Sequence, residues 1–287
     1  MLQYRSIHGR PYYSLQSELG IWLPTDEKAF ESMDVVHHCV TLLFENKLYL
    51  APIAEEGSIR VLDIGTGTDA HPEAEVIGTD IAPSQPEWVP PNLHFEIEDC
   101  TRPWTFPPDS FHFVHLRYLF GCVSDCDALY AEAYKACRPG GWVEACECSV
   151  NLRSDDGSVR EGTAFYDWGR LFNEASSRAG RTMSMVDDGK IVPSFEKAGF
   201  EEITSRLFKL PASPWPRDPR MRELGAFAKL AIAEDLDGYA MYLLTNALGW
   251  TREQVLAYLA RVRTEFNDMS LHPYFTVQVV YGRKPVR

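Results

Sequence analysis

The chain has 287 residues, 45% hydrophobic and 24% charged, enough to bury a sizeable core in one large α/β domain, with or without an appended cap. Its formal net charge of −13 argues against a general nucleic-acid binder, because neutralising phosphates needs clustered Lys and Arg. The sequence shows no membrane-spanning apolar run and no signal-peptide pattern, and its seven scattered cysteines suit reduced thiols better than disulfides or a metal site. We therefore expect a soluble protein of the cytoplasm or nucleus.

The first 50 residues are predicted to form an arm followed by a helix. Residues 1–25 contain few core-forming runs, so this arm either orders by packing on something else or stays partly disordered. A helix is expected over 26–50, capped by Asp26 and carrying apolar residues at roughly helical spacing. His37 and His38 lie in its middle. They are either packing residues or, with His38 slightly favoured, a base presented to a cleft beside the sheet.

Two apolar runs, 60–64 and 74–79, each end in polar residues, which is typical of buried parallel strands. Gly65 and Gly67 suit a sharp turn between them that leaves bare backbone for a ligand. Asp80 ends the second strand, where it is placed to accept hydrogen bonds from a ribose diol. A Gly-x-Gly turn by itself is explained by a purely structural turn about as often as by a ligand site.

Further strands are expected over 93–100 and 111–117, and a Pro-Gly-Gly turn at 139–141 enters a fifth strand after a helix over 127–137. Asp99, in the third strand, could take an adenine amino group. Arg117 ends the fourth strand, where open α/β sheets place ligand-binding residues, and His115 shares its face. For both residues, ligand contact and structural hydrogen bonding remain alternatives.

The second half of the chain is predicted to mix helices and strands. We expect an amphipathic helix around 165–175, a helix end at Gly199, a strand over 202–210 and a final strand over 275–282. A proline-rich linker leads into a helical segment over 220–270. Its aromatic and aliphatic stripe is either the core of a cap or, in part, a hydrophobic roof for an apolar substrate.

The order of these parts resembles the class I S-adenosylmethionine-dependent methyltransferases: a glycine turn, a first acid, a second acid, a short apolar strand and a Pro-Gly-Gly turn. The residues at 61–68, 75–80 and 139–142 are similar to those of the fungal LaeA/UMTA-type methyltransferases, and the similarity extends over nearly the whole chain. The resemblance implies an α/β Rossmann-like fold, with a seven-stranded mostly parallel sheet, helices on both faces and a helical cap. It divides the chain into an arm and helix covering the cleft (1–50), a methyltransferase core (51–211 and 271–287) and a helical cap insertion (212–270).

The resemblance also implies an enzyme of secondary metabolism that methylates a small apolar acceptor, with O-methylation favoured and no nucleic acid or membrane as partner. His38 or His115 would serve as the base for a hydroxyl acceptor. The residues implied to hold the methionine end of S-adenosylmethionine are Asp63, Gly65, Thr66 and Gly67. Asp80 is implied to hold the ribose, and Asp99 and Cys100 the adenine. Arg117 is implied to lie beside them.

One segment departs from the family pattern. Members usually continue the glycine turn with a third glycine and a helix, whereas here 68–72 runs almost directly into the next strand. A parallel crossover with its helix needs at least roughly ten to twelve residues, so this helix is predicted to be a single turn or absent. The chain is then a truncated gene product, a working enzyme with a short crossover, or a protein with lost or altered cofactor use. The alternative functions are a cofactor-independent cyclase or isomerase and a regulatory protein that binds a protein partner.

Overall fold

The computed structural model describes residues 4–13, 22–53, 59–66, 74–82 and 91–286. The chain folds as two compact units. Unit 1 comprises Met1–Asn46, Ser149–Ser184 and Phe208–Val277, and unit 2 comprises Lys47–Cys148, Met185–Leu207 and Gln278–Arg287.

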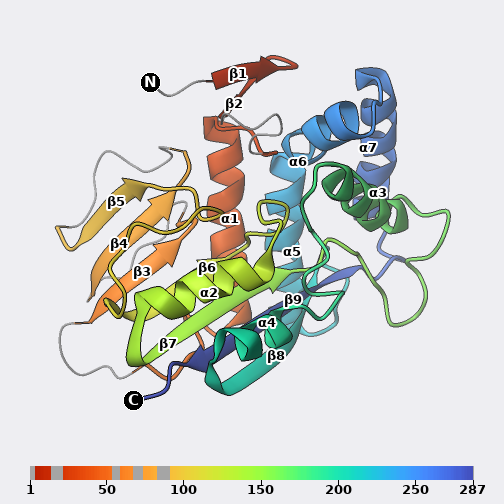
Figure 1. The fold of residues 1–287 in the computed structure, drawn as a ribbon. Helices are drawn as coiled ribbons and strands as arrows, with labels where there is room; N and C mark the ends of the chain where they lie inside the picture. Colours follow the sequence, from red (N-terminus) through yellow and green to blue (C-terminus); the bar gives the residue numbers. More distant parts are fainter. Residues whose placement is uncertain (1–3, 14–21, 54–58, 67–73, 83–90, 287) are drawn as a thin grey trace. The chain divides into compact units, whose positions relative to one another are not determined.

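A parallel sheet forms the centre of unit 2 (Figure 1). Its parallel strands lie in the order β5-β4-β3-β6-β7, with bounds β3 Arg60–Ile64, β4 Glu75–Asp80, β5 Leu93–Ile97, β6 Phe111–Arg117 and β7 Cys137–Cys148. The order continues through β9 (Tyr274–Arg283) to β8 (Glu201–Pro211), which gives seven strands among the described residues. The predicted class I methyltransferase sheet is confirmed.

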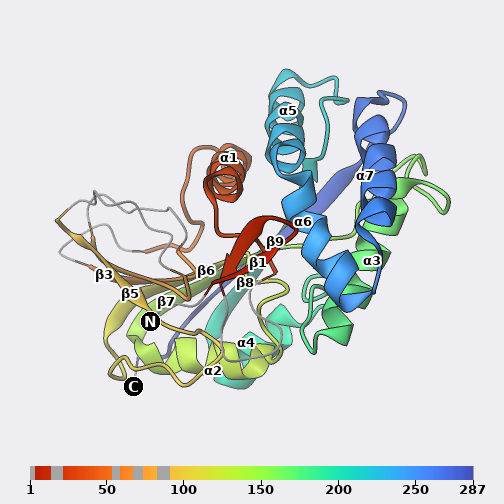
Figure 2. The same cartoon turned by 90° about the horizontal axis from the view of Figure 1, so that it is seen from above.

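Two helices of unit 2, α2 (Cys126–Ala136) and α4 (Ile191–Ala198), lie together on one face of this sheet (Figure 2). Asp125 begins α2 by accepting the N–H of Ala128 at 3.0 Å, and Gly199 ends α4 with a φ of +100°, a conformation that suits glycine. Their apolar side chains pack in one core with the apolar face of the central strands, which includes Leu62, Val114 and Val143.

Unit 1 is mainly helical. Its hairpin pairs β1 (Tyr4–Ile7) with β2 (Arg10–Tyr13), and helix α1 packs along α5 (Figure 1). The helices are α1 Glu27–Leu43, α3 Ala164–Arg178, α5 Pro219–Glu234, α6 Leu236–Tyr242, the π-helical turn η1 Leu243–Ala247 and α7 Arg252–Asn267. Most of the apolar stripe expected over 220–270 is buried in this unit, which supports the interpretation that it is core.

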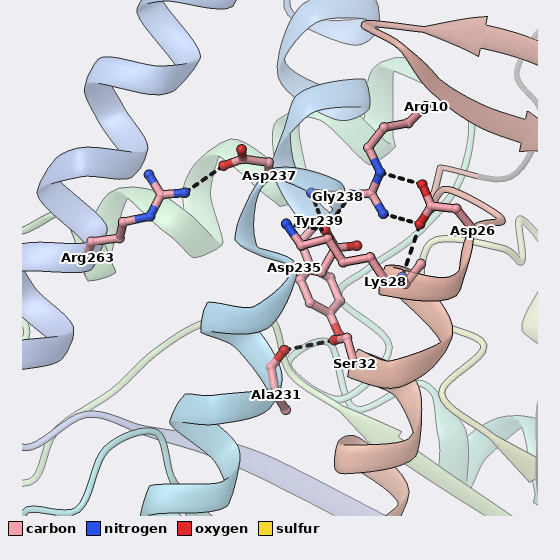
Figure 3. A network of polar contacts seen from close by, with 11 residues as sticks. Arg10, Asp26, Lys28, Ser32, Ala231, Asp235, Asp237, Gly238, Tyr239 and Arg263 are labelled. Carbon is pink, nitrogen blue, oxygen red and sulfur yellow. Dashed lines mark hydrogen bonds and ion pairs between the residues drawn. The ribbon is translucent and has the colours of Figure 1, made fainter.

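Arg10 joins three elements of unit 1 (Figure 3). Its guanidinium forms ion pairs with Asp26, which caps α1, and with Asp235, which caps α6. Asp235 is 2% exposed, and Gly238 leaves no room for a side chain beside it. Ser32 donates to the Ala231 carbonyl at 2.8 Å, and this hydrogen bond links α1 to α5.

The structure corrects two predictions for the first 50 residues. The helix expected over 26–50 ends at Leu43, because Glu45 and Asn46 take left-handed φ values of +60° and +64° and turn the chain. The expected arm contains the β1–β2 hairpin. The division into a cover, a core and a cap insertion stays a prediction.

The short crossover falls partly outside the described residues, which leave out 67–73. β3 and β4 nevertheless pair in parallel from Arg60 opposite Glu75 to Ile64 opposite Thr79, with only residues 65–74 between them. Within the described ranges, none of the helices is both long and apolar enough to cross a membrane.

Candidate active site

The strand order of the sheet reverses between β3 and β6. The chain proceeds from β3 outward to β4 and β5, then returns on the other side of β3 with β6 and β7. In open α/β sheets, ligands bind outside the carboxyl ends of the strands at such a reversal. The predicted cofactor residues that the structure describes lie at or just after these ends: Asp63, Gly65, Thr66, Asp80, Asp99, Cys100 and Arg117. Gly67 lies outside the described residues.

Gly65 makes the turn after β3. Its φ is +70°, and an added Cβ would lie 2.7 Å from Leu119 Cδ2, so both backbone conformation and space favour glycine. The N–H groups of Gly65 and Thr66 donate to the Thr79 carbonyl at 2.8 and 3.0 Å. The Thr66 hydroxyl donates to the Asp63 carbonyl at 2.6 Å. The chain therefore turns sharply at the end of β3 while it stays anchored to β4.

Two acids follow the next strands. Asp80 ends β4 with a half-exposed side chain, and its Oδ1 accepts the N–H of Ala82 at 2.9 Å. Asp99 follows β5, and its Oδ1 accepts from the backbone N–H and the hydroxyl of Thr101 at 3.0 and 2.6 Å. Both side chains are thus held by local turns at the same edge of the sheet.

Cys100 lies between these acids and the core. Burial raises the pKa of its thiol, and the neighbouring Cys122, Asp99 and Asp80 raise it further. The thiol therefore stays protonated at neutral pH and is a poor nucleophile. The Cys100 carbonyl accepts the indole N–H of Trp104 at 3.1 Å, and Trp104 packs in the core of unit 2.

His115 is buried between two carboxylates. Its Nδ1 lies 2.9 Å from Asp63 Oδ1, and its Nε2 lies 4.0 Å from Glu144 Oε1. Burial by itself would lower the pKa of His115, but the hydrogen bond to Asp63 and the charges of Asp63 and Glu144 raise it overall. The imidazole is 3% exposed. It is thus an interior imidazole of unit 2 whose protonated form is favoured by its two carboxyl neighbours.

His38 and this cluster belong to different units. His38 lies on α1 in unit 1 with an exposed side chain, and its ring is edge-on to Phe227 at a centroid distance of 4.6 Å. Arg117 ends β6 directly opposite Cys146 of β7, and burial raises the pKa of Glu144 although the charge of Arg117 partly counteracts that rise. The structure therefore brings His115 and Arg117 to one strand of unit 2, two residues apart.

Sequence reasoning missed two buried glutamates on β7. Glu144 Oε2 accepts the N–H groups of Leu50 and Ala51 at 2.8 and 2.6 Å. Glu147 accepts the N–H groups of Leu119 and Phe120 at 3.0 and 3.2 Å. The sequence did contain a signal for them, namely two acids inside an otherwise apolar central strand. Such acids indicate specific hydrogen-bond partners, because buried carboxylates need them.

The residues at this edge fit a nucleoside cofactor with an amino acid tail. The positive φ of Gly65 exposes backbone without a Cβ, and the half-exposed Asp80 carboxylate at the end of the adjacent strand can accept from a diol. Asp99 supplies a further acceptor after β5. This combination of a glycine turn and carboxylate acceptors suits the ribose and adenine groups of an adenosine-containing molecule.

Comparison with known proteins gives a consistent result. Residues 35–205 match the family model described as a methyltransferase domain. The chain is 33% identical to methyltransferase pytC of Aspergillus terreus, over 99% of this chain and 89% of that protein. It is 30% identical to the secondary metabolism regulator LAE1 of Cochliobolus heterostrophus, over 97% of this chain and 94% of that protein. Among solved structures, phosphoethanolamine N-methyltransferase 2 of Haemonchus contortus in complex with S-adenosyl-L-methionine has a similar fold, with a TM-score of 0.51 and 15% identity over 96% of this chain and 62% of that chain.

Proposed function

Because the chain belongs to the methyltransferase family whose domain model it matches, we propose that it transfers a methyl group from S-adenosylmethionine to a small apolar secondary metabolite, with oxygen as the favoured acceptor atom. The observation that carries this proposal is the left-handed Gly65 turn at the strand-order reversal, with Asp80 ending the adjacent strand. The name of the relative LAE1 supports a role in secondary metabolism.

The proposed cofactor contacts follow the order of the strands. The turn after β3 holds the methionine end, Asp80 accepts from the ribose hydroxyls, and the Asp99–Cys100 segment contacts the adenine. Arg117 lies at the end of β6 beside them. The full set proposed is Asp63, Gly65, Thr66, Gly67, Asp80, Asp99, Cys100 and Arg117.

The protein's part in the chemistry is positioning. The bound donor supplies a methyl group on a cationic sulfur, which is already activated for displacement. The chain's own residues hold the acceptor in line and exclude water, so effective concentration supplies much of the rate. A hydroxyl acceptor also needs a base, and we keep His38 as the candidate because its side chain is exposed rather than enclosed.

Titration of the purified protein with S-adenosylhomocysteine tests the cofactor site. We expect micromolar binding in the unaltered protein, about −8 kcal/mol, and a dissociation constant raised at least about tenfold in Asp80→Asn, because the neutral amide loses charge-assisted bonds to the diol. Asp109→Asn is the matched control, since Asp109 lies before the start of β6 and pairs with Lys284 at 2.7 Å. Equal affinity in Asp80→Asn and the control would contradict the assignment of Asp80.

A regulatory role is the second candidate function, and the similarity to LAE1 favours it. A regulator would form a stable complex with a protein partner in the cytoplasm or nucleus, and it would show no turnover of small acceptors. Methyl transfer to small molecules by the isolated protein would decide against it. Turnover of a substrate without added cofactor would instead favour a cyclase or isomerase on the same fold.

A further inference from the structure

Three charged side chains form a row across the sheet of unit 2. Asp63 on β3 lies opposite His115 on β6, and His115 lies opposite Glu144 on β7 in the strand register. Residues opposite one another in paired strands project to the same face. The row is enclosed, since Asp63, His115 and Glu144 are 2%, 3% and 0% exposed.

One end of the row is joined to the glycine turn. Gly78 on β4 lies opposite Asp63, and a Cβ there would be only 2.6 Å from the Thr66 hydroxyl oxygen. Thr66 therefore occupies the space that a side chain at Gly78 would fill, and its hydroxyl bonds back to the Asp63 carbonyl. The position of Asp63 and the shape of the turn at Gly65 and Thr66 are thus set together.

The other end of the row is joined to the segment that precedes the sheet. Glu144 Oε2 accepts from the backbone of Leu50 and Ala51, and the ring of Tyr49 packs on Phe113 at a centroid distance of 5.2 Å. This segment, residues 49–51, is held against β6 and β7 by one buried carboxylate and one aromatic contact. Glu144 Oε1 lies toward His115 Nε2.

The imidazole of His115 is surrounded on every side. Asp63 faces it from β3, and Glu144 and Cys146 are on β7. Arg117 and Phe113 are on β6 with His115, and Tyr49 lies in the 49–51 segment. Burial raises the pKa of Glu144, and His115, the two backbone donors and Arg117 counteract that rise. An interior carboxylate that loses its cationic neighbour is strongly disfavoured.

We infer that His115 is a positioning residue that fixes Asp63 beside the glycine turn and, by facing Glu144, ties that turn to the 49–51 segment. No contact with substrate is required for this role. The role rests on the proposed function only where cofactor affinity is the readout, because the ordering of the turn is measurable without any ligand.

Two substitutions distinguish the contribution of the Nδ1 atom of His115, which faces Asp63, from that of Nε2, which faces Glu144. His115→Asn keeps a neutral donor near the Nδ1 position that faces Asp63, whereas His115→Gln moves the amide toward the Nε2 position and removes the hydrogen bond that His115 makes to Asp63. We expect His115→Gln to speed hydrogen exchange at the Gly65 and Thr66 amides about tenfold or more and to weaken S-adenosylhomocysteine binding about tenfold. His115→Asn should cause about a threefold change in both measurements.

The same two substitutions at His112 are the controls. His112 lies on the same strand, partly exposed, and its Nδ1 accepts the N–H of Arg60 at 3.2 Å. We expect both His112 variants to stay within about twofold of the unaltered protein in both measurements. If His115→Gln fails to fold, the comparison of His115→Asn with His112→Asn carries the test.

The exchange data distinguish this inference from the proposed function. Absence of S-adenosylhomocysteine binding in the unaltered protein would overturn the proposed function, while exchange at Gly65 and Thr66 would still decide the role of His115. Faster exchange at Leu50 and Ala51 with unchanged turn amides would overturn the inference, and so would His115 variants that match their His112 controls. Faster hydrogen exchange at both the turn amides and the Leu50 and Ala51 amides supports the inference, provided that the effect is larger in His115→Gln than in His115→Asn.

Discussion

Glu147 is a buried carboxyl on β7, and its replacement by Gln should stabilise the protein at neutral and alkaline pH. Its side chain is 1% exposed and its hydrogen-bond donors are the uncharged N–H groups of Leu119 and Phe120. Burial raises the pKa of Glu147 from 4.5 to about 8, although these two bonds lower it. The folded protein therefore holds a proton that the unfolded chain has already released.

The sign and size of the effect follow from this difference. Between about pH 4.5 and about pH 8 the folded state binds more protons than the unfolded state, so the free energy of unfolding falls as the pH rises. At about 1.36 kcal/mol for each pKa unit, the loss amounts to an order of 5 kcal/mol above about pH 8. Glu147→Gln cannot titrate, so the variant gains this amount relative to the unaltered protein.

Urea unfolding followed by tryptophan fluorescence, at steps from about pH 5 to about pH 9, measures the difference. If the Gln amide also changes stability by an amount that does not depend on pH, the whole curve of unfolding free energy against pH shifts and its slope stays the same. Glu96→Gln is the control, because Glu96 is exposed on β5. A difference between Glu147→Gln and the unaltered protein that does not change with pH would refute the reasoning, since Glu147 would then titrate alike in both states.

Three further predictions concern other parts of the molecule. Arg10→Ala should lower the free energy of unfolding by about 3 kcal/mol in thermal or urea unfolding, because it leaves the buried Asp235 with only the longer ion pair to Lys28 at 3.6 Å, and it should cost much less in an Asp235→Asn background. Gly78→Ala should cost about 1–3 kcal/mol and weaken S-adenosylhomocysteine binding, because its Cβ would press on Thr66; unchanged stability and affinity would contradict this packing. His38→Gln should lower kcat for a hydroxyl acceptor about 100-fold with unchanged cofactor affinity if His38 is the base, and an unchanged kcat would remove it from that role.

Local sequence pattern located most elements because their burial is periodic. The strand expected over 111–117 coincides with β6, since most of its residues are apolar and five of its seven residues are buried. The helix over 26–50 was drawn too long because Leu48 and Leu50 continue the apolar spacing beyond the point where the chain turns. The β1–β2 hairpin was missed because the residues that hold it, Asp235 above all, lie far away in the sequence.

The sequence by itself determined the kind of fold and predicted where the cofactor would bind. A glycine turn after an apolar run, with acids ending the next strands, is a local pattern, and its chemistry follows from backbone freedom and carboxylate charge. Only the tertiary structure decided what His115 does. Asp63 is 52 residues away along the chain, and strand register alone brings it and Glu144 to either side of the imidazole. A histidine that the sequence leaves open as a base or a structural group is thereby enclosed between two carboxyl groups that raise its pKa, with almost no solvent around it.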